Sequence, residues 1–390
     1  MERIGIFGGS FNPPHIGHMD AALWAVEALG LSKMLLIPCN VSPGKPESPD
    51  KAENHQRMEM LRRAVADRSK LELCEIELQR GGVSYTRDTL IQLRKLYPNA
   101  ELILCMGSDA FVHFESWKDP ELILENASLA VFFRGKRSDD VAQVQRRLQV
   151  MGAKIYVLDN PVTQISSTQL RRLLAFQCAS PLLHPAVSEF IHEEGLYSTA
   201  ADWKQLPMEQ LEQVVVRLLK PNRIAHVLGC RDTAVELAKR WGADVTDAAR
   251  AGILHDITKA LDGPLQLTLC SEYGIVLDGF SQNNPKTLHA LTGSLVAERI
   301  FGENNAVVDA IRWHTTGKEN MNLLQKIIYV ADYMEPNRDF PGVDKLRHLA
   351  FTDLDGALKL GLEMTLSVLR EQGREVSPES QQAIAWLERK

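Results

Sequence analysis

Six side chains that could bind metal ions occur at intervals through the second half of the chain. They are His226, His255, Asp256, His289, His314 and Asp332. Intervals of about one helical hairpin would let successive helices bring their ligands into the core of a bundle. His255 and Asp256 lie in the apolar stretch AGILHDITKAL, where burial is costly unless they are paired or coordinated. A lone histidine is more often a core or capping residue, so the predicted metal centre depends on the whole set.

The ligand types indicate what this centre could do. Imidazole and carboxylate ligands together suit divalent ions such as Fe or Mn. Ions bound in this way can activate water and hold phosphate oxygens. Lys259, four residues after His255 and so on the same face of an expected helix, is a candidate catalytic contact to phosphate. Arg223 and Arg338 are candidate substrate contacts, although solvated surface charges are common.

A second group of residues, GGSFNPPHIGH at 8–18, has the composition of a phosphate site. Its two glycines let the backbone turn tightly and approach a ligand. A helix beginning near Ile16 would direct free N–H groups and partial positive charge toward that turn. His15 and His18 are three residues apart, so they would share a helix face and could donate to phosphate oxygens. Together these features favour phosphate binding over an ordinary Gly/Pro turn.

The stretch ISSTQLR, residues 165–171, is expected to begin another helix. Ser166, Ser167 and Thr168 are good helix caps, and the free amides at such a helix end can hold phosphate. Arg171, in the next turn, could reach back to the same anion. An ordinary capped helix would look the same, so this motif supports a phosphate site only in combination with the first one.

Strands and helices are expected to alternate in the first half of the chain. Strands are expected at 3–7, 34–38, 71–78, 101–106, 128–133 and 154–158. Helices are expected from Ile16, at 54–67, at 139–150 and from about 167. This alternation predicts an α/β fold, in which a doubly wound parallel sheet has helices on both faces.

After Tyr197 helical periodicity dominates, and STAADWKQLP is expected to be a linker. Helices are expected at 208–219, 223–241, 246–260, 286–301, 304–314 and 322–334. The sequence therefore predicts two domains, an α/β domain at 1–199 and an all-α domain at 200–390.

The composition excludes several classes of protein. Among the 390 residues 45% are hydrophobic and 24% are charged, which is ordinary for a folded domain and excludes a disordered or fibrous chain. The net charge of −6 argues against a nucleic-acid-binding surface. The scattered cysteines, an N-terminus unlike a secretory signal and the lack of a long apolar run favour a cytoplasmic protein with no membrane partner.

The stretch GGSFNPPHIGH resembles the (H/T)xGH signature of nucleotidyltransferases and, at full length, nicotinate mononucleotide adenylyltransferases. YTRDTL, MGSDAF, Trp117, Arg134 and ISSTQLR follow in family order, so the resemblance covers about residues 3–198. It implies a Rossmann-like nucleotidyltransferase fold and adenylyl transfer from ATP, with Mg²⁺, to nicotinate mononucleotide. The mononucleotide phosphate would attack the α-phosphorus of ATP, so catalysis would consist of positioning and charge stabilisation.

This resemblance implies roles for the residues of the two phosphate motifs. His15, His18 and Arg171 would be catalytic and would hold the ATP triphosphate, assisted by the amides of Ser167 and Thr168. Further substrate contacts are implied for Gly8, Gly9, Ser10, Phe11, Gly107 and Arg134.

The resemblance also implies an acceptor site. Asp109 would lie beside a ribose, Trp117 would stack on the pyridine ring, and Thr86 would help to hold the pyridine carboxylate. A core position for Trp117 is the alternative. Lys45 lies in a loop that could close over phosphates, although this chain has SPGK where the family usually has PPHK.

The second half resembles the HD superfamily of phosphohydrolases and, more narrowly, bacterial symmetrical diadenosine tetraphosphate hydrolases. The resemblance covers about residues 207–388 and lies in HVLGC, LHDITK, LHALTG, IRWHTTG and VADYMEPNRDFPGV. It implies that one metal ion is held by His226, His255, Asp256 and Asp332. A second ion would be held by His289 and His314, with Asp256 bridging.

Together these observations predict a bifunctional enzyme. One half would make nicotinate adenine dinucleotide, and the other would hydrolyse diadenosine tetraphosphate to two ADP. Three alternatives stay open: another acceptor (phosphopantetheine or the amidated mononucleotide), a helical half that is a non-catalytic nucleotide and metal sensor, and another phosphate ester as its substrate. The sequence is compatible with a homo-oligomer and does not decide which metal is bound.

Overall fold

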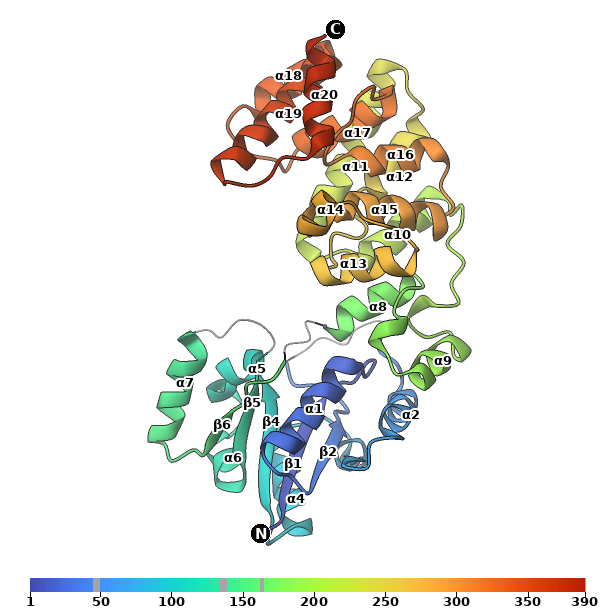
Figure 1. Ribbon diagram of the computed structural model, residues 1–390. Coiled ribbons are helices and arrows are strands. Elements are labelled where there is room, and N and C mark those ends of the chain that lie inside the picture. Colours follow the sequence, from blue (N-terminus) through green and yellow to red (C-terminus); the bar gives the residue numbers. More distant parts are fainter. Residues whose placement is uncertain (45–49, 134–138, 162–164, 390) are drawn as a thin grey trace. The chain divides into compact units, whose positions relative to one another are not determined.

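Our computed structural model describes residues 1–44, 50–133, 139–161 and 165–389 (Figure 1). Its first unit, Met1–Ala200, contains a sheet of six parallel strands. The strands are β1 (Arg3–Gly9), β2 (Lys33–Pro38), β3 (Leu71–Leu73), β4 (Glu101–Gly107), β5 (Ser128–Phe132) and β6 (Ile155–Val157). Their order is β3-β2-β1-β4-β5-β6, and every neighbouring pair is parallel. The predicted doubly wound α/β fold is confirmed. Such sheets bind ligands beyond the carboxyl ends of the strands where the order reverses, which here is between β1 and β4.

Nine helices accompany the sheet in the described part of this unit. They are α1 (Ile16–Ala28), α2 (Asn54–Val65), α3 (Ile76–Arg80), α4 (Thr86–Leu96), α5 (Ser108–Val112), α6 (Pro120–Asn126), α7 (Asp139–Val150), α8 (Ser167–Ala175) and α9 (Pro185–Glu193). Leu93 of α4, Ile123 of α6 and Val144 of α7 join Ile4 and Ile6 of β1 in one core cluster. Burial of both faces explains why the central strands are apolar throughout.

The prediction of a strand at 71–78 is wrong for the second half of that range. Pairing with β2 ends at Leu36 and Leu73, and the chain then forms helix α3. Ile76 of this helix packs against the core cluster, and Gly81 ends it at a φ of 69°. The apolar run was too short for its periodicity to distinguish a strand from a helix.

Helices make up the second unit, Ala201–Lys390, and the structure assigns no strand to the residues that it describes there. They are α10 (Met208–Leu218), α11 (Pro221–Trp241), α12 (Val245–Leu254), α13 (Gly263–Glu272), α14 (Gly279–Asn283), α15 (Leu288–Arg299), α16 (Asn305–Trp313), α17 (Leu323–Met334), α18 (Val343–Thr352), α19 (Leu354–Glu371) and α20 (Pro378–Glu388). The predicted all-α character of this half is confirmed. The division between the units falls after Ala200, one residue beyond the expected boundary.

The helix expected at 246–260 is too long. Helix α12 ends at Leu254, so His255 and Asp256 lie in the turns that follow it rather than inside a helix. The N–H groups of Ile257 and Lys259 donate three residues back, to Leu254 and Asp256. These tighter turns replace the four-residue spacing of an α-helix, and periodicity in an apolar stretch does not reveal that change.

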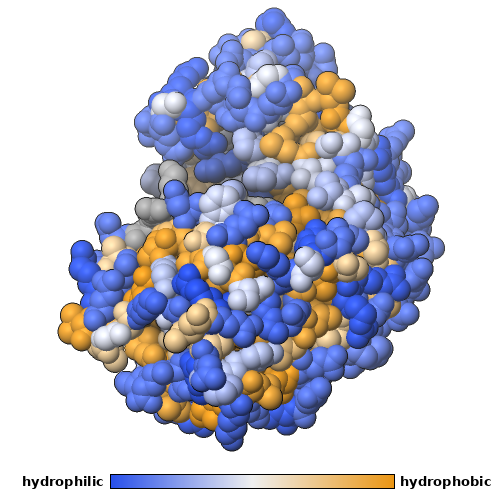
Figure 2. All heavy atoms as spheres, turned by 60° about the horizontal axis from the view of Figure 1, so that its bottom comes forward, coloured by the Kyte–Doolittle hydropathy of each residue, from blue (hydrophilic) through white to orange (hydrophobic). Residues whose placement is uncertain are grey.

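The surface of the chain mixes apolar and polar residues, as Figure 2 shows for one face. Large apolar side chains that are exposed include Leu96 and Val150 in the first unit and Val276 in the second. Among the described helices, none has the combination of length and hydropathy that crossing a membrane requires.

Candidate functional site

The first phosphate motif lies where β1 passes into α1. Gly8 and Gly9 extend β1 beyond the expected 3–7, so the strand carries them to the ligand-binding edge of the sheet. His15 caps α1, and His18 follows in its first turn. Their rings are stacked with centroids 3.7 Å apart, and the His15 N–H donates to His18 Nδ1 at 3.3 Å. Two imidazoles therefore meet the free N–H groups of a helix end, which is a favourable place for an anion.

The second motif contacts the first, although more than 150 residues separate them. Ser166 caps α8 by accepting from Gln169 N at 3.3 Å. Arg171 Nη1 donates to the Asn12 carbonyl oxygen at 2.8 Å, and Ser167 Oγ donates to the Pro13 carbonyl oxygen at 3.1 Å. Burial lowers the pKa of Arg171. The guanidinium and the start of α8, with Thr168 as its second residue, are thus placed beside the loop that ends at His15.

Three residues that the sequence analysis missed hold this loop in place. Arg57 is fully buried and donates to the carbonyl oxygens of Ser10 and Cys39, both at 2.7 Å. Tyr197 Oη donates to Asn12 Oδ1 at 2.7 Å. No local signal distinguishes Arg57 from Arg62 and Arg63, which lie in the same helix. The partners of Asn12 and Tyr197 could be recognised only from tertiary structure.

The other residues predicted for the first unit lie around the same strand ends. Gly8 and Ser10 are exposed, whereas Phe11 is fully buried, with its ring centroid 5.1 Å from that of His18. Gly107 ends β4 and precedes the exposed Asp109 in α5. Two further predicted residues lie outside the described part of the chain: Lys45 and Arg134.

The segments expected to bind the pyridine ring adjoin each other. Thr86 is the first residue of α4, and Trp117 is half-buried, with its ring centroid 5.5 Å from that of Phe114. Lys118 Nζ lies 4.2 Å from the centroid of the Tyr85 ring, so the residues beside Thr86 and Trp117 are in contact. Trp117 packs on the core on one side and is partly accessible, so both of its expected roles are compatible with this position.

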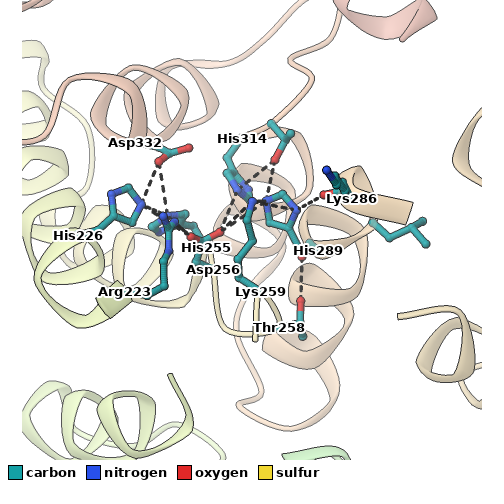
Figure 3. A network of polar contacts seen from close by, with 12 residues as sticks. Arg223, His226, His255, Asp256, Thr258, Lys259, Lys286, His289, His314 and Asp332 are labelled. Atoms are coloured by element: carbon teal, nitrogen blue, oxygen red, sulfur yellow. Dashed lines mark hydrogen bonds and ion pairs between the residues drawn. The ribbon is translucent and has the colours of Figure 1, made fainter. Parts of the chain in front are cut away.

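All six metal-ligand candidates of the second unit converge (Figure 3). They come from α11 (His226), the turns after α12 (His255 and Asp256), α15 (His289), the end of α16 (His314) and α17 (Asp332). Two sets have ligand atoms within 4.8 Å of one another: His226, His255 and Asp332, and His255, Asp256 and His314. Tertiary packing thus gathers side chains that are separated by up to 106 positions in the sequence.

The imidazoles present their Nε2 atoms to the centre of the site. The Nδ1 atoms of His255, His289 and His314 lie 2.7 to 2.8 Å from the backbone carbonyl oxygens of Gly252, Lys286 and Ile311. A carbonyl oxygen only accepts, so each Nδ1 carries the hydrogen and each Nε2 keeps its lone pair. This is the tautomer that ligates metal through Nε2.

Acceptors also face each other across the site. His226 Nε2 lies 3.2 Å from His255 Nε2 and 3.1 Å from Asp332 Oδ1. Lone pairs this close repel unless a cation lies among them, so the donor set fits a metal ion. The two oxygens of Asp256 face different imidazoles: Oδ2 is 3.6 Å from His255 Nε2, and Oδ1 is 3.5 Å from His289 Nε2. A carboxylate that bridges two ions needs this arrangement.

Three cations surround the cluster. Arg223 forms an ion pair with Asp256, and Arg338 Nη2 lies 2.6 Å from Asp332 Oδ1. Lys259 Nζ lies 2.8 Å from His289 Nε2, and burial lowers the pKa of this lysine to about 8. Anionic oxygens that reach the cluster would therefore meet positive charge.

Two residues beside this cluster were not predicted. Thr315 Oγ1 lies 3.1 Å from His289 Nε2 and 3.2 Å from His314 Nε2. Glu335 Oε1 accepts from His226 Nδ1 at 3.0 Å. Thr315 directly follows a predicted ligand, which was a usable signal, whereas nothing local to Glu335 indicates its contact.

Acidification should destabilise the second unit when metal is removed with EDTA. Burial lowers the pKa of His255 and His289 well below its usual value and that of His314 to about 4. Below about pH 6.5 the unfolded chain therefore binds protons that the folded chain does not yet bind. The free energy of unfolding should fall by about 1.4 kcal/mol for each of these histidines and each pH unit. Stability should be fully present above that pH and fall toward pH 4. Urea unfolding at several pH values, followed by hydrogen exchange in α11 and α17, measures the slope of the free energy of unfolding against pH.

A matched variant tests this assignment. His314→Asn should reduce the slope by about one third, because one of three depressed histidines is lost. An unchanged slope in this variant would contradict the prediction.

Comparisons with known proteins match the two halves separately. The cytidylyltransferase-like family model matches residues 6–173, which include His15, His18 and Arg171. The HD domain model matches residues 223–337, which include all six metal-ligand candidates.

Individual relatives show the same division. The symmetrical bis(5′-nucleosyl)-tetraphosphatase of Bacillus subtilis is 38% identical over 183 residues, covering 46% of this chain and 96% of that protein. A Shewanella putrefaciens protein named "Probable nicotinate-nucleotide adenylyltransferase" is 36% identical over 214 residues, covering 50% of this chain and 99% of that protein. A crystal structure from Clostridium acetobutylicum, described as a predicted HD superfamily hydrolase involved in NAD metabolism, is 36% identical, with a TM-score of 0.46, over 47% of this chain and 99% of its own.

Proposed function

Because the chain belongs in one half to the nicotinate-nucleotide adenylyltransferases and in the other to the symmetrical bis(5′-nucleosyl)-tetraphosphatases, we propose that it is a bifunctional enzyme. The first unit transfers the adenylyl group of ATP to nicotinate mononucleotide, which gives nicotinate adenine dinucleotide, a precursor of NAD. The second unit hydrolyses diadenosine tetraphosphate to two ADP. The observation that supports this most is that each unit has its own, differently built site for phosphate oxygens.

In the first unit, charge stabilisation replaces a side-chain nucleophile. A 5′-phosphate oxygen of the mononucleotide bonds to the α-phosphorus of ATP, while the bond to the bridging oxygen breaks and pyrophosphate leaves. His15 and His18 donate to the phosphate oxygens at the start of α1, and Arg171 holds the departing phosphates from the α8 side. Mg²⁺ bound to ATP would neutralise part of the charge on its phosphates. The contacts of Asn12 keep both helix ends at a fixed separation, which positions the reacting groups.

In the second unit, the six candidate ligands would hold a pair of divalent ions, with Asp256 shared between them. Such a pair supplies a water of lowered pKa and neutralises phosphate oxygens. The chain orients the centre by fixing the imidazole tautomers through backbone carbonyl oxygens. Lys259, Arg223 and Arg338 surround the place where the tetraphosphate would lie and stabilise its negative charge.

The hydrolase half is tested by incubating the full chain with diadenosine tetraphosphate and Mn²⁺ or Fe²⁺. We expect two ADP per substrate, and an excess of EDTA should abolish the reaction because both the water and the charge neutralisation depend on the ions. Chromatography of the nucleotides measures the products. Release of ATP and AMP would contradict symmetric cleavage, and binding without turnover would contradict hydrolysis and favour a sensor.

The transferase half is tested by supplying ATP and Mg²⁺ with one acceptor at a time. Nicotinate mononucleotide should release pyrophosphate fastest, followed by its amidated form and then phosphopantetheine. A preference for phosphopantetheine would contradict the proposed acceptor.

A further inference from the structure

His226 differs from the other imidazoles of the metal site in the group that holds its Nδ1. His255, His289 and His314 donate to neutral backbone carbonyl oxygens, whereas His226 donates to the carboxylate of Glu335 at 3.0 Å. The Glu335 side chain is 1% exposed, so water screens its charge little. A carboxylate behind a ligating imidazole makes the ring a stronger ligand.

The position of Glu335 is determined by several contacts. Its Oε2 accepts from Asn337 N at 2.7 Å and from Asn337 Nδ2 at 2.8 Å. Asn337 Nδ2 also donates to the carbonyl oxygen of Ala225, the residue before His226. Glycine at position 229 of α11 leaves room for the carboxylate, because a Cβ there would lie 2.5 Å from Glu335 Oε2. These contacts thus fix the Glu335 carboxylate between helix α11, which bears His226, and the segment that follows α17.

Contacts on the opposite side of the cluster oppose metal binding instead. His289 Nε2, the atom that would ligate an ion, lies 2.8 Å from Lys259 Nζ and 3.1 Å from Thr315 Oγ1. An ion at this position must displace the ammonium donor from the lone pair of His289. An ion beside His226 meets its donors on the carboxylates instead: Arg338 contacts Asp332 Oδ1 and Arg223 contacts Asp256. His226 Nε2 itself faces His255 Nε2 and Asp332 Oδ1, both of which are acceptors.

We propose that Glu335 is a positioning residue that makes the metal position beside His226 bind its ion more tightly than the position beside His289. This inference rests on the proposed metal centre and goes beyond it, because it makes the two ions unequal and assigns the cause to a residue that touches neither ion. One ion should then stay with the protein during purification, while the other exchanges with the solution.

Mn²⁺ binding by the full chain tests this proposal without relying on activity. The protein is stripped with EDTA, dialysed and titrated, and free Mn²⁺ is read from its electron paramagnetic resonance signal. The wild type should show a tight and a weak class of site. Glu335→Gln should weaken the tight class by about 10- to 100-fold and change the weak class by less than about twofold.

Two further variants separate this effect from a loss of folding. Gly229→Ala leaves Glu335 in the chain but displaces its carboxylate, so it should weaken the tight class while the circular dichroism of the helices stays that of the wild type. Glu303→Gln removes an equally buried carboxylate, which binds Arg250 away from the metal cluster. This control should lower the unfolding temperature and leave both Mn²⁺ classes within about twofold.

The outcomes distinguish the inference from the function on which it rests. A wild type that binds no Mn²⁺ would refute the proposed metal centre. A tight class that Glu335→Gln leaves unchanged, or a fall of both classes by the same factor, would refute only the role of Glu335. Loss of the tight class alone in Glu335→Gln and Gly229→Ala would support it.

Discussion

Asp256→Asn should lower the rate of diadenosine tetraphosphate hydrolysis by roughly 10³-fold and leave adenylyl transfer unchanged. Asp256 is 1% exposed, and its two oxygens face His255 and His289 on opposite sides of the cluster. An amide offers one neutral oxygen in place of two that share a negative charge, so it cannot bridge two cations equally well. Metal catalysis contributes several kcal/mol, and about 1.4 kcal/mol corresponds to a factor of ten in rate.

Release of ADP at saturating Mn²⁺ measures this effect, with the metal content of each sample determined in parallel. Asp262→Asn is a matched control, because Asp262 caps α13 and accepts from Leu265 N outside the proposed ligand set. The control should keep its turnover within about twofold. An Asp256→Asn enzyme that retains more than a tenth of its activity would contradict the bridging role.

His18→Ala should lower the turnover of adenylyl transfer by about 10²- to 10³-fold, the usual effect of removing one donor to developing charge. His18 lies in the first turn of α1, half-buried and stacked on His15, where it can reach the same oxygens as the free N–H groups of the helix. The substitution keeps the helix, because alanine is a good helix former. The KM for nicotinate mononucleotide should change little, since the residues proposed for the acceptor site, Thr86 and Trp117, lie in other segments.

Pyrophosphate release in the presence of saturating ATP measures this turnover. His55→Ala provides the control, because His55 is an exposed histidine in the first turn of α2 in the same unit. Circular dichroism and thermal unfolding of the His18→Ala protein report whether the first unit is folded, since hydrolysis by the second unit would not. An increase in KM with unchanged turnover would assign His18 to ground-state binding instead.

The sequence was informative wherever the signal lies within a few residues. The Gly-Gly turn before His15 and His18, the caps at Ser166 and the helical periodicity after Tyr197 all depend on short-range interactions. A local pattern also singled out His255 and Asp256, because a histidine beside an aspartate in an apolar stretch is costly to bury without a partner. The other four metal-ligand candidates were proposed from their spacing along the chain.

Tertiary structure decided what no local pattern contains. Residues 76–80 form a helix because packing and the end of strand pairing overrode an ambiguous apolar run, and the turns after Leu254 orient His255 and Asp256. The contacts of Arg57 with Ser10 and of Glu335 with His226 join residues 47 and 109 positions apart. Propensity and periodicity describe interactions between near neighbours, whereas the burial of a charge depends on which distant segments pack around it. For this reason the sequence could propose which residues do the chemistry, but it could not indicate the residues that hold them in place.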